Sequence, residues 1–244
     1  MNKELIKKRF GRKLKEYNDN ARIQKRMAEK LIGMLSQNQK EEYSAILEIG
    51  CGTGLLTQYS VNNLSYKTYT AIDIVPDCEE YIKTINSQIE FISEDIEEYI
   101  VSDNRKYDLI ISNAALQWVD DVTGFIDKLT EKLNDGGMLI FSSFGTENFR
   151  EIFFVTGKTL SYLSKKEYEE KLKKYNPLIE EEVWVMAFKT PQEVLKHIQN
   201  TGVNALSSEI WTKRDLINFE KEYNGFCANR PTLTYNPLYI KIQK

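Results

Sequence analysis

Three glycines and a later acid are the residues with the clearest chemical meaning in this chain of 244 residues. Gly50, Gly52 and Gly54 directly follow the apolar run 45–49, and Asp73 comes roughly 20 residues later. Glycines at a strand-to-helix turn let the backbone approach a ligand closely, and an acid at this distance can accept hydrogen bonds from ribose hydroxyls. The pattern therefore predicts a nucleotide-like cofactor site.

The glycine spacing then narrows the class of cofactor. A dinucleotide-binding turn reads G-x-G-x-x-G, but Leu55 stands at its third glycine position, and no Lys-Ser/Thr pair of a phosphate-binding loop follows. What remains resembles the E/D-x-G-x-G-x-G turn of methyltransferases that use S-adenosylmethionine (SAM). The resemblance implies that the backbone around Cys51 lies against the methionine and ribose parts of SAM. It also implies that Glu48 orients either the loop or the ammonium group of the ligand.

Alternating segments predict the sheet that positions these residues. Strand-like runs separated by helix-length segments favour a mainly parallel sheet with helices on both faces. The runs are 45–49, 68–73, 89–93, 107–112 and 137–142. We expect an α/β, Rossmann-like, doubly wound fold with a mainly parallel seven-stranded sheet, an antiparallel C-terminal edge strand and added helices that cover the site.

The rest of the chain is expected to cover this core. Two helices are predicted in the first 40 residues, with an apolar stripe at Ile23, Met27, Leu31, Ile32 and Leu35. Further helices are predicted at 147–175, 190–201 and 212–223, and extended segments at 179–188 and 232–242. We interpret residues 1–244 as one methyltransferase domain with a helical cover (1–40), a cofactor-binding core (45–144) and a substrate-covering part (145–244).

Other candidate residues stand where the expected strands end. In an open parallel sheet, ligands bind beyond the carboxyl ends of the strands. The predicted roles are ribose binding for Asp73 with Ile74, adenine binding for Asp95 with Ile96, and a place between cofactor and substrate for Asn113 with Ala114. The two acids could instead serve a turn or cap a helix.

The residues after the fourth expected strand bear on the substrate. Asn113 begins Asn-Ala-Ala-Leu-Gln-Trp, which differs from the Asn-Pro-Pro-Tyr or Asp-Pro-Pro-Tyr of enzymes that methylate amino groups of bases. Base methylation is therefore not expected. Gln117 and Trp118 either belong to the core and surface or form a wall of the cofactor cleft.

Several motifs together resemble the malonyl-acyl carrier protein O-methyltransferases of biotin synthesis, nearly from end to end. They are Phe10-Gly11-Arg12 with Tyr17 and Ile23-Gln24, and the segments 113–118, 141–145, 201–205 and 233–239. The resemblance implies methyl transfer from SAM to the free carboxylate of malonyl-acyl carrier protein, which gives the methyl ester primer and S-adenosylhomocysteine. Malonyl-coenzyme A is the alternative acceptor.

The residue types agree with a carboxylate acceptor. A carboxylate is ionised at neutral pH and needs no general base. The one histidine, His197, is expected on a helix surface. A desolvated carboxylate still needs partners. The candidates are Tyr17 and Gln24 in the family-like N-terminal motif, and Arg22, Arg26 or Arg150, of which Arg150 could equally form an exposed salt bridge.

Charge is distributed unevenly along the chain. Residues 3–30 hold eleven Lys or Arg and four acids, whereas the whole protein has a net charge of −3. This segment is either a solvated helical face or a landing surface for an acidic carrier protein.

Composition limits the remaining classes of function. The absence of an apolar run near 18 residues, of a signal-peptide region and of C-x-x-C spacing leads us to expect a cytoplasmic, monomeric protein without a membrane span, disulfide framework or metal. Nucleic-acid binding is not expected, because only Phe10 and Tyr17 interleave the basic segment. The alternatives are a methyltransferase for a small free carboxylic acid of the aconitate type and a non-catalytic SAM-binding or nucleic-acid-binding protein.

Overall fold

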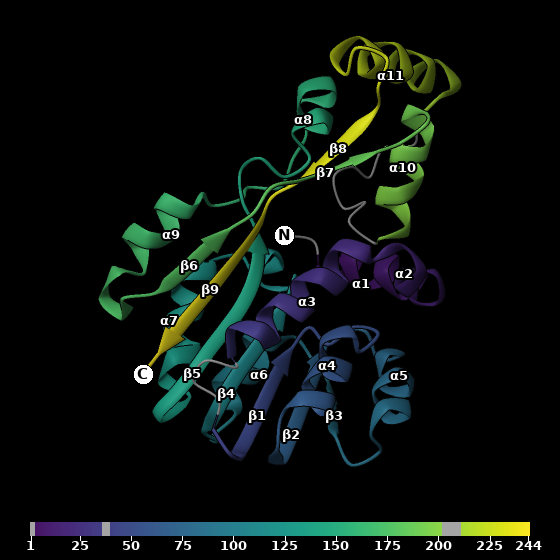
Figure 1. Ribbon diagram of the computed structural model, residues 1–244. Helices are drawn as coiled ribbons and strands as arrows, with labels where there is room; N and C mark the ends of the chain where they lie inside the picture. The colour runs from purple at the N-terminus through teal and green to yellow at the C-terminus, as the bar shows by residue number, and fades with distance from the viewer. Residues whose placement is uncertain (1–2, 36–39, 202–210) are drawn as a thin grey trace.

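The computed structural model describes residues 3–35, 40–201 and 211–244, and its main feature is a seven-stranded sheet (Figure 1). The strand order is β3-β2-β1-β4-β5-β9-β6. Residues 202–205, which belong to one of the family-like motifs, lie outside the described residues.

The five predicted parallel strands all form. They are β1 (Tyr43–Ile49), β2 (Tyr66–Asp73), β3 (Glu90–Ser93), β4 (Tyr107–Asn113) and β5 (Leu133–Phe144), and each neighbouring pair among them is parallel. The chain first runs outward from β1 to β3 and then returns to place β4 on the other side of β1. Strand order therefore reverses between β1 and β4, which is where such folds open a ligand crevice.

Helices cover both faces of the sheet, as the strand patterns require. Leu109 and Ile111 of β4 pack into the core with α3, α4 and α5, whereas Ile110 packs into the opposite core with α6, α7 and α9. Successive side chains of a strand point to opposite faces of the sheet, so a strand that is apolar at every position is buried on both faces of the sheet. These helices are α3 (Arg22–Leu35), α4 (Leu55–Asn63), α5 (Cys78–Ile85), α6 (Ile96–Ser102), α7 (Val122–Glu131) and α9 (Lys165–Lys171).

The antiparallel strand was predicted correctly, but it does not lie at the edge. β9 (Pro237–Gln243) runs antiparallel to β5 and also pairs with β6 (Leu178–Glu181), which forms the edge. The 179–188 segment therefore supplies a strand to the main sheet, which the sequence analysis left unassigned.

Both predicted extended segments divide into two strands. β7 (Trp184–Ala187) and β8 (Thr232–Tyr235) form a second, two-stranded sheet that continues away from β6 and β9 (Figure 1). Asn236 stands at the division. Its side-chain Nδ2 donates to Glu181 Oε1 and to the Glu182 carbonyl, both at 3.0 Å, and its own carbonyl accepts from Gly145 N at 2.8 Å.

The second sheet carries the remaining helices. These are α8 (Arg150–Thr156), α10 (Pro191–Asn200) and α11 (Lys213–Phe226); α8 packs on β8 and α11, and α10 packs on α11 and on the N-terminal α2. The prediction of one helix over 147–175 is therefore wrong for the residues between α8 and α9. α8 ends at Gly157, whose φ is +66°, and α9 starts only at the Ser164 capping box.

The first residues form three helices, where two were predicted. α1 (Lys3–Gly11) and α2 (Leu14–Asn20) precede α3, and the predicted apolar stripe of α3 is buried. The chain breaks at Ala21 after Asn18-Asp19-Asn20, residue types whose side chains compete with the helical backbone for hydrogen bonds. Figure 1 shows α1 and α2 above the end of the main sheet from which α4 starts, below α10, whereas α3 runs across the face of the sheet.

Candidate active site

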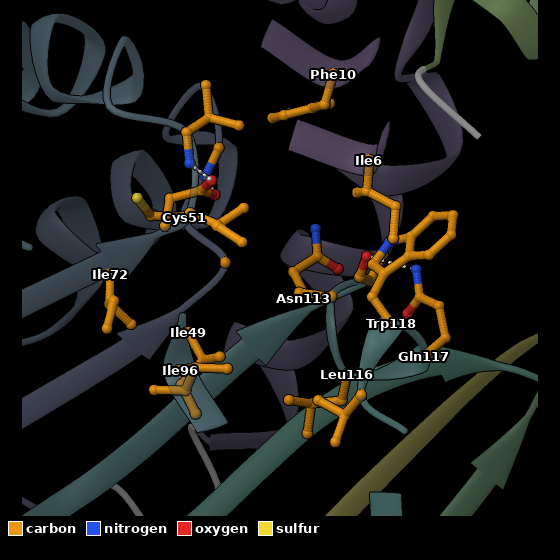
Figure 2. Close-up of a pocket in the computed structure, with 18 of the residues that line it drawn as sticks. Ile6, Phe10, Ile49, Cys51, Ile72, Ile96, Asn113, Leu116, Gln117 and Trp118 are labelled. Atoms are coloured by element: carbon orange, nitrogen blue, oxygen red, sulfur yellow. Dashed lines mark hydrogen bonds between the residues drawn. The ribbon is translucent and has the colours of Figure 1, made fainter. Parts of the chain in front are cut away.

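A cavity opens at the carboxyl ends of β1 and β4, at the predicted point of strand reversal. Phe10 and Ile6 lie above it, Cys51 and Ile72 on one side, and Asn113, Gln117 and Trp118 on the other (Figure 2). The predicted site residues that line it are Tyr17, Gln24, Gly50, Cys51, Gly52, Asp73, Ile74, Asp95, Ile96, Asn113 and Ala114. Glu48, Gly54 and Arg150 do not line it.

The glycine loop is packed too closely against its neighbours to accept a side chain at two positions. Gly50 has a φ of +68°, and a Cβ there would lie 2.3 Å from the Cβ of Ala115. Gly54 has a φ of +80°, and its Cβ would lie 2.3 Å from Ile85 Cδ1. Both positions therefore need glycine for backbone conformation and for space.

Glu48 lies beneath the loop. Its Oε2 accepts from Thr57 Oγ1 at 2.7 Å and from the Tyr69 hydroxyl at 2.6 Å, and the residue is 1% exposed. Burial raises the pKa of Glu48 to about 7, although these two donors oppose the shift. Glu48 does not line the cavity, and its Oε1 has no partner among the described residues, so both proposed roles, toward the loop and toward the ligand, stay predictions.

Asp73 faces the cavity and also holds its loop. Oδ2 accepts from Gly52 N at 2.8 Å, and Oδ1 accepts from Val75 N at 2.9 Å. Burial raises the pKa of Asp73, while the backbone donors act against that rise. The Cys78 side chain and the Ile74 backbone also hydrogen-bond to this carboxylate, which lines the cavity and is an acceptor for ligand hydroxyls.

Asp95 has two roles at the other end of the cavity. Its Oδ1 caps α6 by accepting from Glu97 N at 2.9 Å, as one alternative proposed. Its Oδ2 accepts from Lys3 Nζ at 2.6 Å, and Ile96 lies beside it in the lining. Capping and cavity contact thus coexist.

Asn113 joins the N-terminal cover to the sheet. Its Nδ2 donates to the Gln24 carbonyl at 2.9 Å, and its Oδ1 accepts from Ser142 Oγ at 2.7 Å. The next residue, Ala114, has a φ of +51° and donates its N–H to the same Ser142 Oγ at 3.0 Å. A left-handed alanine is strained, and such strain concentrates at functional sites.

The cover contributes Tyr17 and Gln24. Burial, with a smaller effect of Asp73, raises the pKa of Tyr17, so its hydroxyl stays a hydrogen-bond donor. Gln24 is 3% exposed, and its Oε1 has no partner among the described residues. Buried polar atoms are normally paired, so this oxygen indicates a ligand contact. Asn18 Oδ1 also accepts from Thr53 Oγ1 at 2.5 Å and ties α2 to the glycine loop.

The arginines proposed for the acceptor lie elsewhere. Arg150 is about half exposed, pairs with Glu147 at 3.2 Å and does not reach the cavity, as its salt-bridge alternative proposed. Arg26 lies over the Trp184 ring at 4.3 Å, and Arg22 is exposed on α3. Among the described residues, Lys3 is the only cation in the lining, against four acids: Asp73, Glu94, Asp95 and Glu97.

Several lining residues were not predicted from the sequence. Lys3, Ile6 and Phe10 line the cavity from one face of α1, a spacing visible in the sequence, but nothing in a charged segment separates this lysine from its neighbours. Gln117 and Trp118, which had two interpretations, both line the cavity.

His197 lies on a helix as predicted, but it is not fully on the surface. Its ring is half-buried on α10, and its Nε2 lies 2.8 Å from the Tyr235 hydroxyl. Burial, with the charge of Arg22, lowers the pKa of His197. The neutral form is therefore favoured.

Within the ranges 3–35, 40–201 and 211–244, no group of three or more His, Cys, Asp or Glu is arranged to hold a metal ion. In the same ranges, no helix combines the length and the apolar character needed to cross a membrane.

Comparison with known proteins places this site in a family. Residues 19–207 match a family model described as a methyltransferase domain. A malonyl-[acyl-carrier protein] O-methyltransferase of Calditerrivibrio nitroreducens is 38% identical over 93% of this chain and 91% of its own length. One of Chlorobium luteolum is 34% identical over 99% and 95%.

The chain belongs to the malonyl-[acyl-carrier protein] O-methyltransferase family. A third member of this family, from Bacteroides thetaiotaomicron, is 33% identical over 100% of this chain and 99% of its own. The family match thus reaches through the cover and the second sheet, well beyond the glycine loop.

Solved structures support the fold independently. The YcgJ protein of Bacillus subtilis superposes with a TM-score of 0.57 at 12% identity, over 88% of this chain and 98% of that one. A structure described as a DhpI-SAM-HEP complex superposes with a TM-score of 0.55 at 16% identity, over 71% and 88%. The predicted Rossmann-like class is confirmed.

Proposed function

We propose that this chain transfers the methyl group of SAM to the free carboxylate of malonyl-acyl carrier protein. A carboxylate oxygen forms the new O–CH3 bond, the S–CH3 bond breaks with its electron pair going to sulfur, and no proton moves. The products are the malonyl methyl ester, the primer for biotin synthesis, and S-adenosylhomocysteine. SAM supplies a positively charged sulfonium that carries the reactive methyl group.

The observation that carries the proposal is the nearly full-length match to relatives named for this reaction. A match confined to the glycine loop would support only the use of a similar cofactor. Here it includes β8, β9 and the helices around them, all outside the glycine loop.

The cavity fits the cofactor on three grounds. The glycine loop lines it at Gly50 and Gly52, the Asp73 carboxylate faces it, and the buried oxygens Gln24 Oε1 and Gln117 Oε1 lack partners among the described residues. The excess of acids in the lining favours a cationic ligand. We assign Asp73 to the ribose and Asp95 with Ile96 to the adenine.

Tyr17 and Gln24 are the proposed contacts for the acceptor carboxylate. Both line the cavity from the cover, beside Phe144 and Thr201. The tyrosine hydroxyl and the glutamine amide can donate to a carboxylate without a full charge. An arginine is not required, because the acceptor carboxylate approaches the positively charged sulfonium of SAM. The attraction between these two opposite charges becomes stronger as water leaves the site.

The carrier protein is proposed to dock on the exposed cations of the cover. We call these the basic cover residues: Arg12, Lys15, Arg22 and Lys25, all exposed on or next to α2 and α3. Other cations of the N-terminal segment are engaged within the protein, since Lys30 pairs with Glu180 at 2.7 Å and Lys13 with Glu16 at 3.8 Å. Electrostatic docking would act mainly on the association rate and its salt dependence.

The test compares four acceptors at increasing salt: malonyl-acyl carrier protein, malonyl-coenzyme A, free malonate and aconitate. We expect kcat/KM to be highest for the carrier-bound substrate and to fall steeply with salt for that substrate alone. Equal values of kcat/KM for the carrier-bound and coenzyme A forms would contradict the proposed docking surface. Faster methylation of a free acid would make the small-acid alternative correct.

A further inference from the structure

Helix α1 bridges the two ends of the cavity while burying none of its own residues. Its inner face presents Lys3, Ile6 and Phe10, all in the cavity lining. Phe10 lies over the glycine loop, where a Cβ on Gly52 would come within 3.2 Å of its ring, and it makes an edge contact with Tyr17 at 5.1 Å. α1 therefore packs mainly on the site itself.

At the adenine end, Lys3 is bound by two acids. Its Nζ donates to Asp95 Oδ2 at 2.6 Å and also to Glu97 Oε2. All three side chains are largely shielded, with 28%, 16% and 26% of their surface exposed for Lys3, Asp95 and Glu97. A charge-assisted bond in such surroundings is stronger and more directional than a pair on an open surface.

Together the contacts fix the Asp95 carboxylate in one orientation. Oδ1 is held by the backbone N–H of Glu97 at 2.9 Å, and Oδ2 is held by Lys3. Each carboxylate oxygen can accept a second hydrogen bond, so one position on each remains for a ligand donor. Lys3 also offsets part of the repulsion between Asp95 and Glu97.

We propose that Lys3 is a cofactor-positioning residue, which orients the Asp95 carboxylate toward the exocyclic amine of adenine and closes α1 over the bound nucleoside. This inference rests on the proposed function, because it takes the cavity to hold SAM and S-adenosylhomocysteine. Lys3 acts through Asp95 and takes no part in the methyl transfer, so its loss should weaken binding of both forms of the cofactor.

Calorimetric titration with S-adenosylhomocysteine tests this with four variants: Lys3→Met, Asp95→Asn, the double variant, and Lys8→Met as a matched control. Lys8 lies on the same helix but is exposed and outside the lining. We expect Lys3→Met to raise Kd about tenfold, as for loss of a shielded charge-assisted hydrogen bond, and Lys8→Met to change it less than about twofold. Lys3→Arg, which keeps the charge, should retain most of the affinity.

Two readouts separate positioning from a merely structural role. The double variant should bind no more weakly than Asp95→Asn alone, because coupled residues are not additive. For S-inosylhomocysteine, where an oxo group replaces the amine, wild type and Lys3→Met should bind alike. In steady-state kinetics of Lys3→Met, the KM for SAM should rise by a larger factor than kcat falls at saturating SAM, as expected for a residue that acts on cofactor binding.

The results that would overturn the role of Lys3 differ from the result that would overturn the proposed function. If wild type binds S-adenosylhomocysteine and Lys3→Met matches Lys8→Met, the inference is overturned while the proposed function stands. Additive losses in the double variant, or an equal loss for the inosyl analogue, would also overturn it. If wild type bound no S-adenosylhomocysteine at all, the proposed function itself would fail.

Discussion

The three carboxylates at the ends of neighbouring strands differ in what they contact. Glu48 accepts from two hydroxyls beneath the loop, Asp73 accepts from two backbone amides, and Asp95 caps a helix and binds Lys3. Only Asp73 and Asp95 face the cavity. Residue type and strand position predicted that these acids matter, but the distinction among them depends on which neighbours fold against each one.

The raised pKa of Glu48 predicts that the free energy of unfolding of this protein depends on pH. Its pKa is raised to about 7 in the folded protein from 4.5, so folding favours its protonated form. The contribution of Glu48 to the free energy of unfolding is fully present below its pKa in the unfolded chain, 4.5, and is lost as pH rises toward about 7. Glu48→Gln, which mimics the neutral acid, should therefore gain stability over wild type across this range, on the order of 1–3 kcal/mol.

Urea unfolding at pH values spanning this range measures the difference. Glu98→Gln is the control, because Glu98 is exposed on α6. A constant offset between Glu48→Gln and wild type at all pH values would show that Glu48 does not titrate in this range.

Tyr17 and Arg150 give opposite predictions for activity. Tyr17→Phe removes the proposed donor to the acceptor carboxylate and should lower kcat/KM for malonyl-acyl carrier protein by roughly 10- to 100-fold, with little change in SAM affinity. Arg150→Ala should stay within about twofold, since this side chain pairs with Glu147 at 3.2 Å and Glu151 at 4.0 Å and does not line the cavity.

Steady-state kinetics at saturating SAM decide between them. Tyr59→Phe, a tyrosine on α4 outside the lining, is the control for loss of a hydroxyl. Normal activity of Tyr17→Phe together with a large loss in Arg150→Ala would reverse the two assignments.

Among the elements, local signals predicted the core well and the added parts less well. Strands β1 to β5 have strong apolar runs with helix-length spacers, so their place in a parallel sheet could be inferred from the sequence. The split of 232–242 into β8 and β9 could not, because it depends on Asn236 bonding to Glu181 and Gly145 far along the chain. The break after α8 did have sequence signals, Gly157 and the Ser164-Glu167 box, which were overlooked.

Two glycines in neighbouring elements predict opposite effects of the same substitution. Gly50→Ala places a methyl group 2.3 Å from Ala115 Cβ at a φ of +68°, so it should distort the loop and abolish measurable S-adenosylhomocysteine binding. Gly33 is exposed in α3, and no atom lies within 4 Å of its added Cβ. Gly33→Ala should therefore stabilise the fold by about 0.5–1 kcal/mol and leave binding unchanged.

Thermal unfolding and ligand titration on the two variants check this pair. Cofactor binding by Gly50→Ala with wild-type affinity would mean that the loop adapts more readily than its geometry indicates.

At the scale of the whole molecule, the positions of the basic cover residues and of the cavity indicate how a carrier protein could bind and bring its acyl group to the site. The basic cover residues belong to the segment that also supplies Tyr17 and Gln24 to the cavity. An acidic carrier docked there could deliver an acyl arm to the acceptor end. The charge imbalance was visible in the sequence, whereas the pairing of Lys3 with Asp95 and of Lys30 with Glu180 required the fold.

Charge reversal at Lys15 and Lys25 tests this arrangement. The double change to Glu should raise KM for malonyl-acyl carrier protein several-fold at low salt, with a smaller effect at high salt, and leave malonyl-coenzyme A kinetics nearly unchanged. Reversal of Lys166, an exposed lysine on α9, is the matched control. An equal loss on both acceptors would indicate damage to the site and not to docking.

The most direct test of the central claim is intact mass spectrometry of malonyl-acyl carrier protein after incubation with this protein and SAM, with acetyl-acyl carrier protein alongside. We expect the malonyl form alone to gain the mass of one CH2 unit, and alkaline hydrolysis of the ester to remove this gain. If the malonyl form gained no mass under conditions where the protein binds SAM, the proposed methyl transfer to its carboxylate would be wrong.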